Sequence, residues 1–415
     1  MVDIKPSIPV FTLVCHHGIL GIARSLGRLG IDVYGIDRDI DQAPFRSKYF
    51  VDAFEWDLDE RPAQETVDFL CERARATGQR PLLIPTSDEM AVMVAKNADA
   101  LSECFVFARQ DATLIEKLVS KRDNFELAKT AGIPVPDTVF PLSVGDVEKF
   151  AENTAYPVMV KGISGSKLFA RTGRKMEFAH SKDDLLRLYA QMEDPRDPNI
   201  MLQEYIPGGD DTIWMFDGYF DQTGACRFGI TGRKLRQTPP HMGSTSLGIC
   251  EHNETVFQLT TDFMSAIGYT GILDIGFRYD ARDGQYKLLD PNPRIGSTFR
   301  LFLGTNGMDT ARYLYMDVTG QTLPESKARE GRKWVVEGAD LRAFAVYRRE
   351  GSLTFWQWLR SFRGVEEAVW FAIDDLRPFW VEFREVAAGG LRYTWQGLLR
   401  TVGIRTKRDK ETASN

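Results

Sequence analysis

The 415-residue sequence has few cysteines and histidines, and it has no long apolar run. Its 5 cysteines are widely spaced, odd in number and without a Cys-x-x-Cys pair, which argues against a disulfide framework and against a zinc site. No segment approaches the roughly 20 uncharged apolar residues of a membrane-spanning helix, and the first apolar run lacks the cleavage pattern of a signal peptide. These absences predict a soluble, cytoplasmic protein.

A strong excess of one charge is also missing. The net charge of −6 argues against a dedicated nucleic-acid binder, although a local basic patch is compatible with that total. The 43% of hydrophobic and 27% of charged residues are ordinary for a globular protein and exclude a disordered or fibrous chain. At roughly 150 residues per domain, the length predicts two or three domains.

Residues 1–113 alternate apolar strands with helices, as in a doubly wound α/β domain. Strands are expected at 10–14 and 31–36, and Gly18 and Gly21 lie in the turn and helix between them. The spacing of these glycines departs from the dinucleotide-binding pattern Gly-x-Gly-x-x-Gly. A plain Rossmann-like domain is therefore preferred, and an NAD-dependent enzyme is the weaker alternative.

A further strand at 81–85 leads into Thr86-Ser-Asp-Glu89, which has the form of a helix capping box with Thr86 as the N-cap. Two interpretations stay open. The segment is only a helix start, or it places Ser87 and Asp88 at the mouth of the sheet, where α/β proteins bind ligands.

The segment 271–294 predicts a β-hairpin, because an Asp-Gly turn separates two strand-like runs. Side chains two residues apart share a strand face, so Asp290 and Asn292 are expected to converge with Asp274 on the partner strand. Carboxylate and amide oxygens without His or Cys suit Mg²⁺, particularly where phosphates complete the shell. Arg294 adds a planar cation that suits phosphate or carboxylate.

Three further segments have the composition of anion or nucleotide contacts. Lys161 ends a predicted strand and opens a basic, glycine-containing loop that is not a Walker A motif, and a solvated loop is the simpler interpretation. Residues 203–211 run from a strand into a turn with acids at both ends, where a plain turn is the simpler interpretation. In the third segment, Arg233 and Lys234 suit an acyl phosphate or a carboxylate, and a solvated basic loop is equally compatible.

The composition changes near residue 330. Six of the 8 Trp follow that position, with 15 Lys and Arg against 12 Asp and Glu, whereas the whole chain is acidic. Helices are predicted near 352–362 and 365–376, and the aromatic residues are expected to pack this tail onto the rest of the protein. An amphipathic surface for anionic lipids is the alternative.

Four segments, in this order and at these separations, resemble the ATP-grasp superfamily, most closely its carboxylate–amine ligases of the D-aspartate-ligase-like and carbamoyl-phosphate-synthase-like branch. They are 120–136, 156–161, 203–208 and 286–294. The resemblance implies an α/β fold, α+β in parts, and the following organisation. A Rossmann-like domain occupies 1–113, an ATP-grasp lid subdomain 114–205, a catalytic subdomain 206–325 and a Trp- and Arg-rich helical extension 326–415.

The resemblance also implies roles for individual residues. Lys121 and Lys161 correspond to the lysines that hold the ATP phosphates, and Gln203 precedes the hinge that contacts adenine. The hinge comprises Glu204, Tyr205 and Ile206, and the ribose-binding acid corresponds to Asp210 or Asp211. The metal ligands correspond to Asp274, Asp290 and Asn292, and the catalytic cations to Arg233, Lys234 and Arg294.

The reaction that the resemblance implies is ATP-dependent and uses Mg²⁺, with Mn²⁺ as a substitute. A carboxylate is activated as an acyl phosphate, and an amine then attacks it to give an amide, ADP and phosphate. Two positions depart from the family. The first metal carboxylate falls on Gly276, with Asp274 as the expected replacement, and Asp290 stands where Glu is commoner. A non-catalytic ATP-binding module is therefore the alternative function.

The expected partners are a small-molecule carboxylate and an amine, with no nucleic acid and no transmembrane segment. Peripheral membrane contact by the C-terminal tail and a homodimer are left open.

Overall fold

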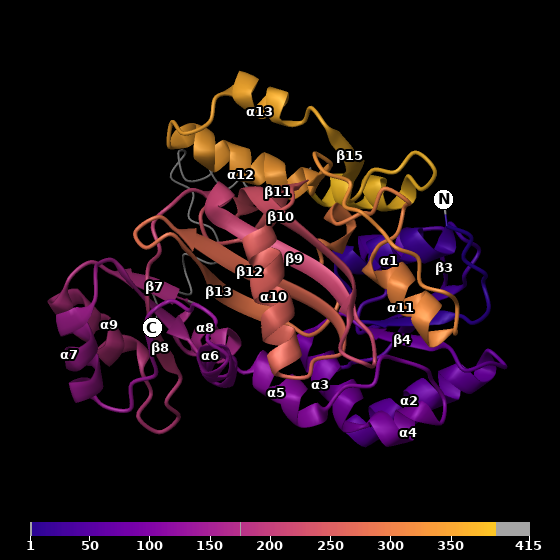
Figure 1. Cartoon of the computed structure of the whole chain (residues 1–415), viewed down its shortest axis with the longest axis horizontal. Coiled ribbons are helices and arrows are strands. Elements are labelled where there is room, and N and C mark those ends of the chain that lie inside the picture. Colours follow the sequence, from indigo (N-terminus) through magenta and orange to yellow (C-terminus); the bar gives the residue numbers. More distant parts are fainter. Residues whose placement is uncertain (1, 175, 387–415) are drawn as a thin grey trace, which may run out of the picture.

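Three β-sheets with their surrounding helices form the structure, a computed structural model that describes residues 2–174 and 176–386 (Figure 1). The first sheet has the strand order β3-β2-β1-β4, and all its strands are parallel. Its strands are β1 (Val10–Leu13), β2 (Val33–Asp37), β3 (Phe50–Glu55) and β4 (Leu82–Pro85). Its helical elements are α1 (His17–Gly27), η1 (Ala43–Arg46), α2 (Ala63–Ala76), α3 (Asp88–Lys96) and α4 (Ala98–Ser102). The doubly wound prediction for this region is confirmed.

The start of α3 differs from the prediction. Ser87, not Thr86, is the N-cap, and its hydroxyl accepts from the backbone N–H of Met90. Thr86 instead donates its hydroxyl to the backbone carbonyls of Leu13 and Val14. The predicted cap was therefore wrong by one residue, because the Thr86 hydroxyl ties β4 to the end of β1.

A disulfide between Cys71 and Cys104 lies in the core between α2 and the end of α4. The expectation that the cysteines form no disulfide was wrong. The two residues are 33 positions apart, and only the packing of α2 against α4 brings them together. Cys15, Cys226 and Cys250 are free thiols.

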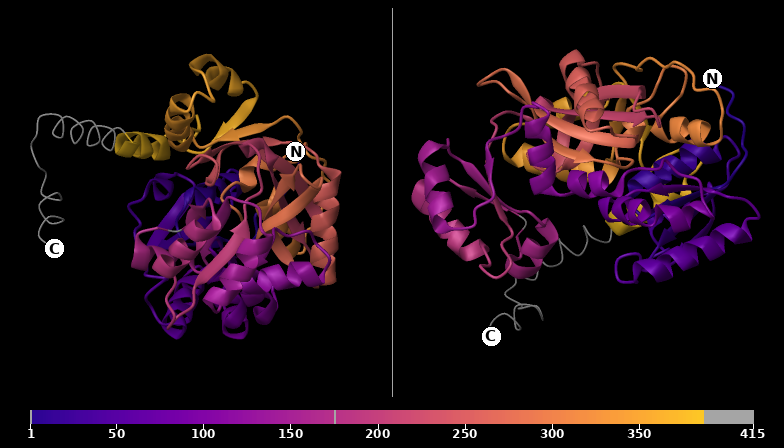
Figure 2. Two further views of the ribbon diagram at one scale, coloured as in Figure 1. Left: turned by 90° about the vertical axis from the view of Figure 1, so that its left-hand side faces the viewer. Right: turned by 60° about the horizontal axis from the view of Figure 1, so that its bottom comes forward.

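The second sheet is antiparallel, with the order β5-β8-β6-β7, and stands to one side of the molecule (Figure 2). Its elements are β5 (Thr138–Val139), α7 (Val144–Asn153), β6 (Val158–Gly162), α8 (Gly165–Thr172), β7 (Met176–Ala179), α9 (Lys182–Met192) and β8 (Ile200–Glu204). Two helices precede it, α5 (Ala112–Val119) and α6 (Lys121–Thr130). They are separate because Ser120 is extended and caps α6, so that Lys121 begins a helix.

The third sheet is the largest and has the order β13-β12-β9-β10-β11-β14-β15. Its strands before residue 330 are β9 (Ile213–Phe220), β10 (Cys226–Thr238), β11 (Ser244–Cys250), β12 (Gly271–Asp280) and β13 (Gln285–Asn292). The helical elements around it are η2 (Asp210–Thr212), α10 (Glu254–Ala266), η3 (Phe299–Leu301) and α11 (Thr310–Val318). The predicted hairpin is confirmed as β12 and β13, which pair antiparallel.

The C-terminal segment adds two strands to this sheet and three helices to its outer edge. Its elements are β14 (Lys333–Val335), α12 (Glu337–Arg349), α13 (Phe355–Ser361) and β15 (Val365–Ala368), and residues 377–386 are also helical. The helix predicted at 365–376 was wrong, because Val365–Ala368 pairs parallel with β14 at the edge of the sheet. The extension is therefore mixed rather than purely helical. None of the described helices is long and apolar enough to cross a membrane.

The prediction that aromatic residues pack the tail inward holds for only some of them. Trp334 and Trp370 are buried, whereas Trp356 is 66% and Trp380 54% exposed. Trp395 lies outside the described residues.

Buried ion pairs attach the C-terminal segment to strands and helices that lie earlier in the chain. The Asp340 carboxylate is fully buried and accepts from Arg236 at 2.8 and 3.0 Å and from the Trp358 indole at 2.8 Å. We expect Asp340→Ala to lower the free energy of unfolding by about 3–5 kcal/mol, because it leaves the Arg236 cation buried and unpaired. Urea unfolding followed by tryptophan fluorescence measures this loss.

Asp374→Ala is the matched control. Asp374 pairs with Arg28 at 2.9 Å, but 37% of its side chain is exposed, so a loss within about 1 kcal/mol is expected. Equal losses in the two variants would contradict a structural role specific to the buried pair.

Candidate functional site

A cleft of about 270 Å³ lies between the second sheet and the β13 edge of the third sheet. Its wall on the second sheet consists of alternate residues of three adjacent strands, since side chains two apart share a face. These are Met159 and Lys161 of β6, Met176 and Phe178 of β7, and Met201 and Gln203 of β8. Most of this wall is apolar, which suits a planar base, whereas its lysine suits an anion.

The charged part of the cleft contains two lysines. The Lys161 ammonium donates to the Gln203 side-chain carbonyl at 2.7 Å, and the Lys121 ammonium donates to the backbone carbonyl of Gly162 at 3.0 Å. Burial and the neighbouring Lys121 cation together lower the pKa of Lys161 to about 8, against the opposing effect of Asp290. Two cations held this close together are suited to a polyanion such as a triphosphate.

Asp290 lies at the same end of the cleft and faces these lysines. Burial and the nearby Asp88 raise its pKa to about 6, against the opposing effect of Lys121, Arg294 and Lys161. A carboxylate among cations suits a divalent metal ion that bridges the protein and phosphate oxygens.

The hairpin brings the three predicted metal ligands to one place. Asp274 pairs directly with Asn292 across β12 and β13, and Gly276 pairs with Asp290. The Asn292 amide donates to the Asp274 backbone carbonyl at 3.1 Å. No group of three or more His, Cys, Asp or Glu side chains with metal-binding geometry occurs in residues 2–174 and 176–386. Two carboxylates and one amide oxygen nevertheless fit Mg²⁺ if phosphate oxygens complete its shell.

Arg294 connects this hairpin to the first sheet. Its guanidinium donates to Asp88 at 2.9 Å and to the Asn292 side-chain carbonyl at 3.1 Å, and it lies 3.9 Å from Asp274. Asp88 begins α3, directly after β4. Of the two sequence interpretations of this segment, the one that placed Ser87 and Asp88 at a ligand site therefore receives support.

Lys234 and Arg233 lie on opposite faces of β10. The Lys234 ammonium lines the cleft and donates to the Gly243 carbonyl at 2.9 Å and to the Gln237 side chain at 3.1 Å. Arg233 points away from the cleft and pairs with Glu251 at 2.7 Å. Only Lys234 of this predicted pair therefore reaches the cleft.

ATP affinity is expected to decrease as the pH rises above about 8. Burial lowers the pKa of Lys161 and of Lys234 to about 8, so both side chains lose their positive charge over this range in the free enzyme. Below that pH both are cations and attract phosphate. Calorimetric titration of ATP between pH 7 and roughly pH 9.5 tests this. A lysine side chain with an unperturbed pKa of about 10.4 would keep its charge over most of this range and leave the affinity unchanged. The Lys234→Arg variant should lose less affinity, and an unchanged pH profile in the wild type would contradict the prediction.

Glu204 of the predicted hinge lines the cleft and also takes part in an ion network. Glu204 accepts from Lys287 at 2.9 Å and from Arg282 at 2.6 Å, so its carboxylate is held in an ion network. Tyr205 and Ile206 line the cleft, and the Arg278 guanidinium lies 5.4 Å from the Tyr205 ring centroid.

The two candidates for the ribose-binding acid lie outside the lining of the cleft. Asp211 is 64% exposed at its side chain and lies 4.0 Å from Arg233. Asp210 accepts from the Gln237 amide at 2.9 Å and from the Tyr347 hydroxyl of α12. Hydrogen bonds therefore run from the C-terminal segment through Asp210 and Gln237 to Lys234.

This connection makes Tyr347 a positioning residue that sequence analysis missed. We expect Tyr347→Phe to lower kcat/KM for ATP by roughly 5- to 10-fold, the equivalent of one typical net hydrogen bond of about 1 kcal/mol. Steady-state kinetics with ATP varied would measure the change. Tyr315→Phe is the control, because the Tyr315 hydroxyl bonds to the backbone of Ser7 and Ile8. A similar loss in both variants would contradict the connection to Lys234.

Asp217 is a second residue that the sequence did not indicate. It is fully buried, neither carboxylate oxygen has a hydrogen-bond partner among residues 2–174 and 176–386, and it pairs across β9 and β12 with Asp274. Burial and the Asp274 charge hold its pKa well above the usual range. Its position within the apolar strand Ile213–Phe220 carried no sequence signal for a site.

Known proteins of similar sequence include a D-aspartate ligase. The chain is 27% identical over 297 residues to D-aspartate ligase of Enterococcus faecium (strain Aus0004), which is 67% of this chain and 69% of that protein. No known family model matches the chain.

Solved structures with the same fold cover most of the chain. The biotin carboxylase domain of Hydrogenobacter thermophilus 2-oxoglutarate carboxylase, a complex with MgADP, ADP and bicarbonate, has a TM-score of 0.60 at 16% identity. The match covers 79% of this chain and 74% of that one. L-amino acid ligase from Bacillus licheniformis has a TM-score of 0.59 at 15% identity, with 80% and 79% covered. These likenesses establish the fold.

Proposed function

Since the chain is an ATP-dependent ligase of the ATP-grasp superfamily, with ATP and Mg²⁺ as its cofactors, we propose that it joins an amino acid to a second small molecule through an amide bond. A carboxylate oxygen takes the terminal phosphoryl group of ATP, and the amine nitrogen then displaces phosphate from the acyl carbon. The observation that carries this proposal is the cleft itself, apolar on one wall and lined by Lys121, Lys161 and Asp290.

The residues of the cleft supply positioning and charge neutralisation, which dominate catalysis of phosphoryl transfer. Lys121 and Lys161 hold phosphate oxygens, and the apolar wall with Tyr205 and Ile206 holds the base. Asp290, Asn292 and Asp274 would hold Mg²⁺, which offsets the charge of the phosphates.

Two cations complete the proposed reaction centre. Lys234 and Arg294 face the acyl phosphate, where they offset its developing negative charge. A ribose contact by Asp210 or Asp211 and a catalytic role for Arg233 remain predictions from the family resemblance.

An amino acid is proposed as one substrate because a D-aspartate ligase is similar in sequence and an L-amino acid ligase has the same fold. The test is a coupled assay of ADP release over a panel of amino acids and small carboxylic acids, with mass spectrometry of the products. ADP release that requires both a carboxylate and an amine, with an amide product, is expected.

Two other outcomes would redirect the assignment. ATP binding without ADP release from any pair would favour the non-catalytic module suggested by Gly276. Binding of NAD without binding of ATP would favour the dehydrogenase alternative.

The boundaries at residues 113, 205 and 325, a homodimer and a cytoplasmic location also remain proposals. The Cys71–Cys104 disulfide bears on the last of these, because disulfides persist mainly in oxidising compartments. Contact of the C-terminal segment with a membrane is a separate question from the reaction.

A further inference from the structure

Exposed apolar side chains are concentrated on the C-terminal segment. Of the 15 large hydrophobic residues that are exposed in the described chain, 9 fall within residues 341–383. The most exposed are Ile373 at 86%, Trp356 at 66%, Trp380 at 54% and Phe383 at 53%. Soluble proteins seldom gather so much exposed apolar surface on one segment unless it contacts something else.

In the same segment, several acidic side chains face the protein body, whereas most basic side chains are exposed to solvent. Four of its acids pair with cations of the protein body: Asp340 with Arg236, Asp375 with Arg24, Asp374 with Arg28 and Glu367 with Arg300. Whereas Arg332 is buried and pairs with Glu366 and Glu367, the seven arginines within residues 342–384 are exposed, and none of the seven forms an ion pair within the described residues. They are Arg342, Arg348, Arg349, Arg360, Arg363, Arg377 and Arg384.

The helix at 377–386 combines both features. Trp380 and Phe383 are three residues apart, so they share one helix face, and both are exposed, as is Leu376 directly before the helix. Arg377 and Arg384 flank that face. Aromatic and aliphatic side chains next to arginine are typical of helices that lie in the membrane interface, where arginine reaches the lipid phosphates.

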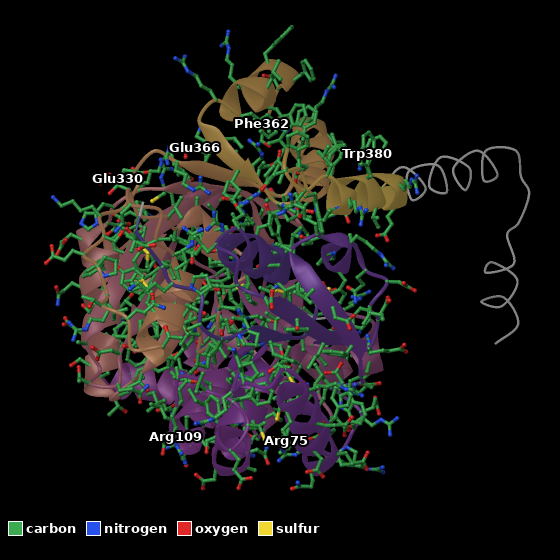
Figure 3. The ribbon with its side chains drawn as sticks, turned by 90° about the vertical axis from the view of Figure 1, so that its right-hand side faces the viewer. Arg75, Arg109, Glu330, Phe362, Glu366 and Trp380 are labelled. Atoms are coloured by element: carbon green, nitrogen blue, oxygen red, sulfur yellow. A yellow bond between two sulfur atoms is a disulfide. The ribbon has the colours of Figure 1, made fainter. Side chains whose placement is uncertain are left out.

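We propose that the exposed side chains of residues 341–384, here called the C-terminal surface, dock on an anionic lipid membrane. Figures 1 and 3 place this segment along one outer edge of the molecule. The sequence after residue 386 adds 6 Lys and Arg against 2 acids, so it too has an excess of positive charge. The electrostatic attraction is local, because the whole chain carries a net charge of −6.

Flotation of the full-length protein with vesicles tests the proposal. Association is expected with vesicles that contain phosphatidylglycerol, but not with phosphatidylcholine alone, and it should decrease with added salt. The double variant Arg377→Glu/Arg384→Glu is expected to lower partitioning at least about tenfold, since each basic residue near an anionic surface contributes about 1 kcal/mol. Trp380→Ser/Phe383→Ser tests the apolar contribution and should weaken binding comparably.

The matched control is Arg75→Glu/Lys117→Glu, which makes the same charge change on the first sheet's helices and on α5, outside the C-terminal surface. Arg75 lies at the end of the molecule opposite Trp380 (Figure 3). The control should bind vesicles as the wild type does. The thermal unfolding midpoint of each variant verifies its fold, and Arg360→Glu/Arg363→Glu replaces the first variant if that one does not fold.

Three results would overturn the proposal. The wild type does not associate with anionic vesicles, the control variant loses as much vesicle binding as Arg377→Glu/Arg384→Glu, or Trp380→Ser/Phe383→Ser binds vesicles as the wild type does. The first result would leave a protein as the remaining partner for this surface. Because catalysis is not part of the readout, failure here leaves the proposed reaction untouched.

Discussion

Lys161→Met is expected to lower kcat/KM for ATP by roughly 10²–10³-fold, the loss typical of removing one preorganised group that offsets developing charge. The Lys161 ammonium lies on the cleft-facing side of β6 and is held at 2.7 Å by Gln203. Methionine keeps most of the side-chain volume and removes only the cation. The remaining cation at Lys121 cannot replace it, because that side chain donates to the Gly162 carbonyl from the neighbouring helix.

The matched control is Lys167→Met. Lys167 lies on α8 in the basic segment that follows Lys161, but its side chain is 63% exposed and pairs with Asp197 at 3.0 Å. A change of less than about twofold is expected there, since exposed ion pairs contribute little. Initial rates of ADP release with ATP varied measure both variants. Equal effects of the two substitutions would show that Lys161 acts only through the overall charge of the segment.

Local sequence patterns were sufficient for the parts of the site that lie on one hairpin or one strand. The turn and the two-residue spacing predicted that Asp274, Asp290 and Asn292 share a face, and the register of β12 and β13 confirms this. Lys161 was found because it ends an apolar strand ahead of glycines, a local composition that the fold preserves.

Contacts between residues distant in the chain could not be predicted in this way. Tyr347 reaches Asp210 from a helix 137 positions away, and Asp88 reaches Arg294 over 206 positions. The sequence placed Asp88 at the mouth of a sheet but could not indicate its partner Arg294, and nothing in the sequence around Tyr347 indicated a site, because each contact forms only when whole elements pack together. The same holds for β15, whose strand conformation depends on pairing with β14 rather than on its own composition.

Gly276 is one of the two positions where the sequence departs from the family pattern. The structure shows where this departure falls in the site. It lies on β12 directly opposite Asp290 of β13. The family resemblance implies a carboxylate on each strand at this register position, whereas here only Asp290 supplies one. A Cβ added at Gly276 would meet only the Trp214 carbonyl, at 3.9 Å, so there is room for a side chain. The nearest carboxylate on the same strand is that of Asp274, opposite Asn292.

Asp290→Asn is therefore expected to lower kcat/KM by roughly 10²–10³-fold and to raise the Mg²⁺ concentration for half-maximal activity, because the amide keeps the shape but removes the charge that attracts the ion. Asp274→Asn is expected to raise the Mg²⁺ requirement by a smaller factor of roughly 10, as for a group that supports the ligands. Gly276→Asp should shift the requirement in the opposite direction, since it restores a carboxylate opposite Asp290. Mg²⁺ titrations of ADP release on the three variants measure these shifts. If Asp274→Asn leaves the Mg²⁺ dependence unchanged while Gly276→Asp lowers the requirement, then Asp274 does not replace the missing acid, and Asp290 with Asn292 holds the ion without it.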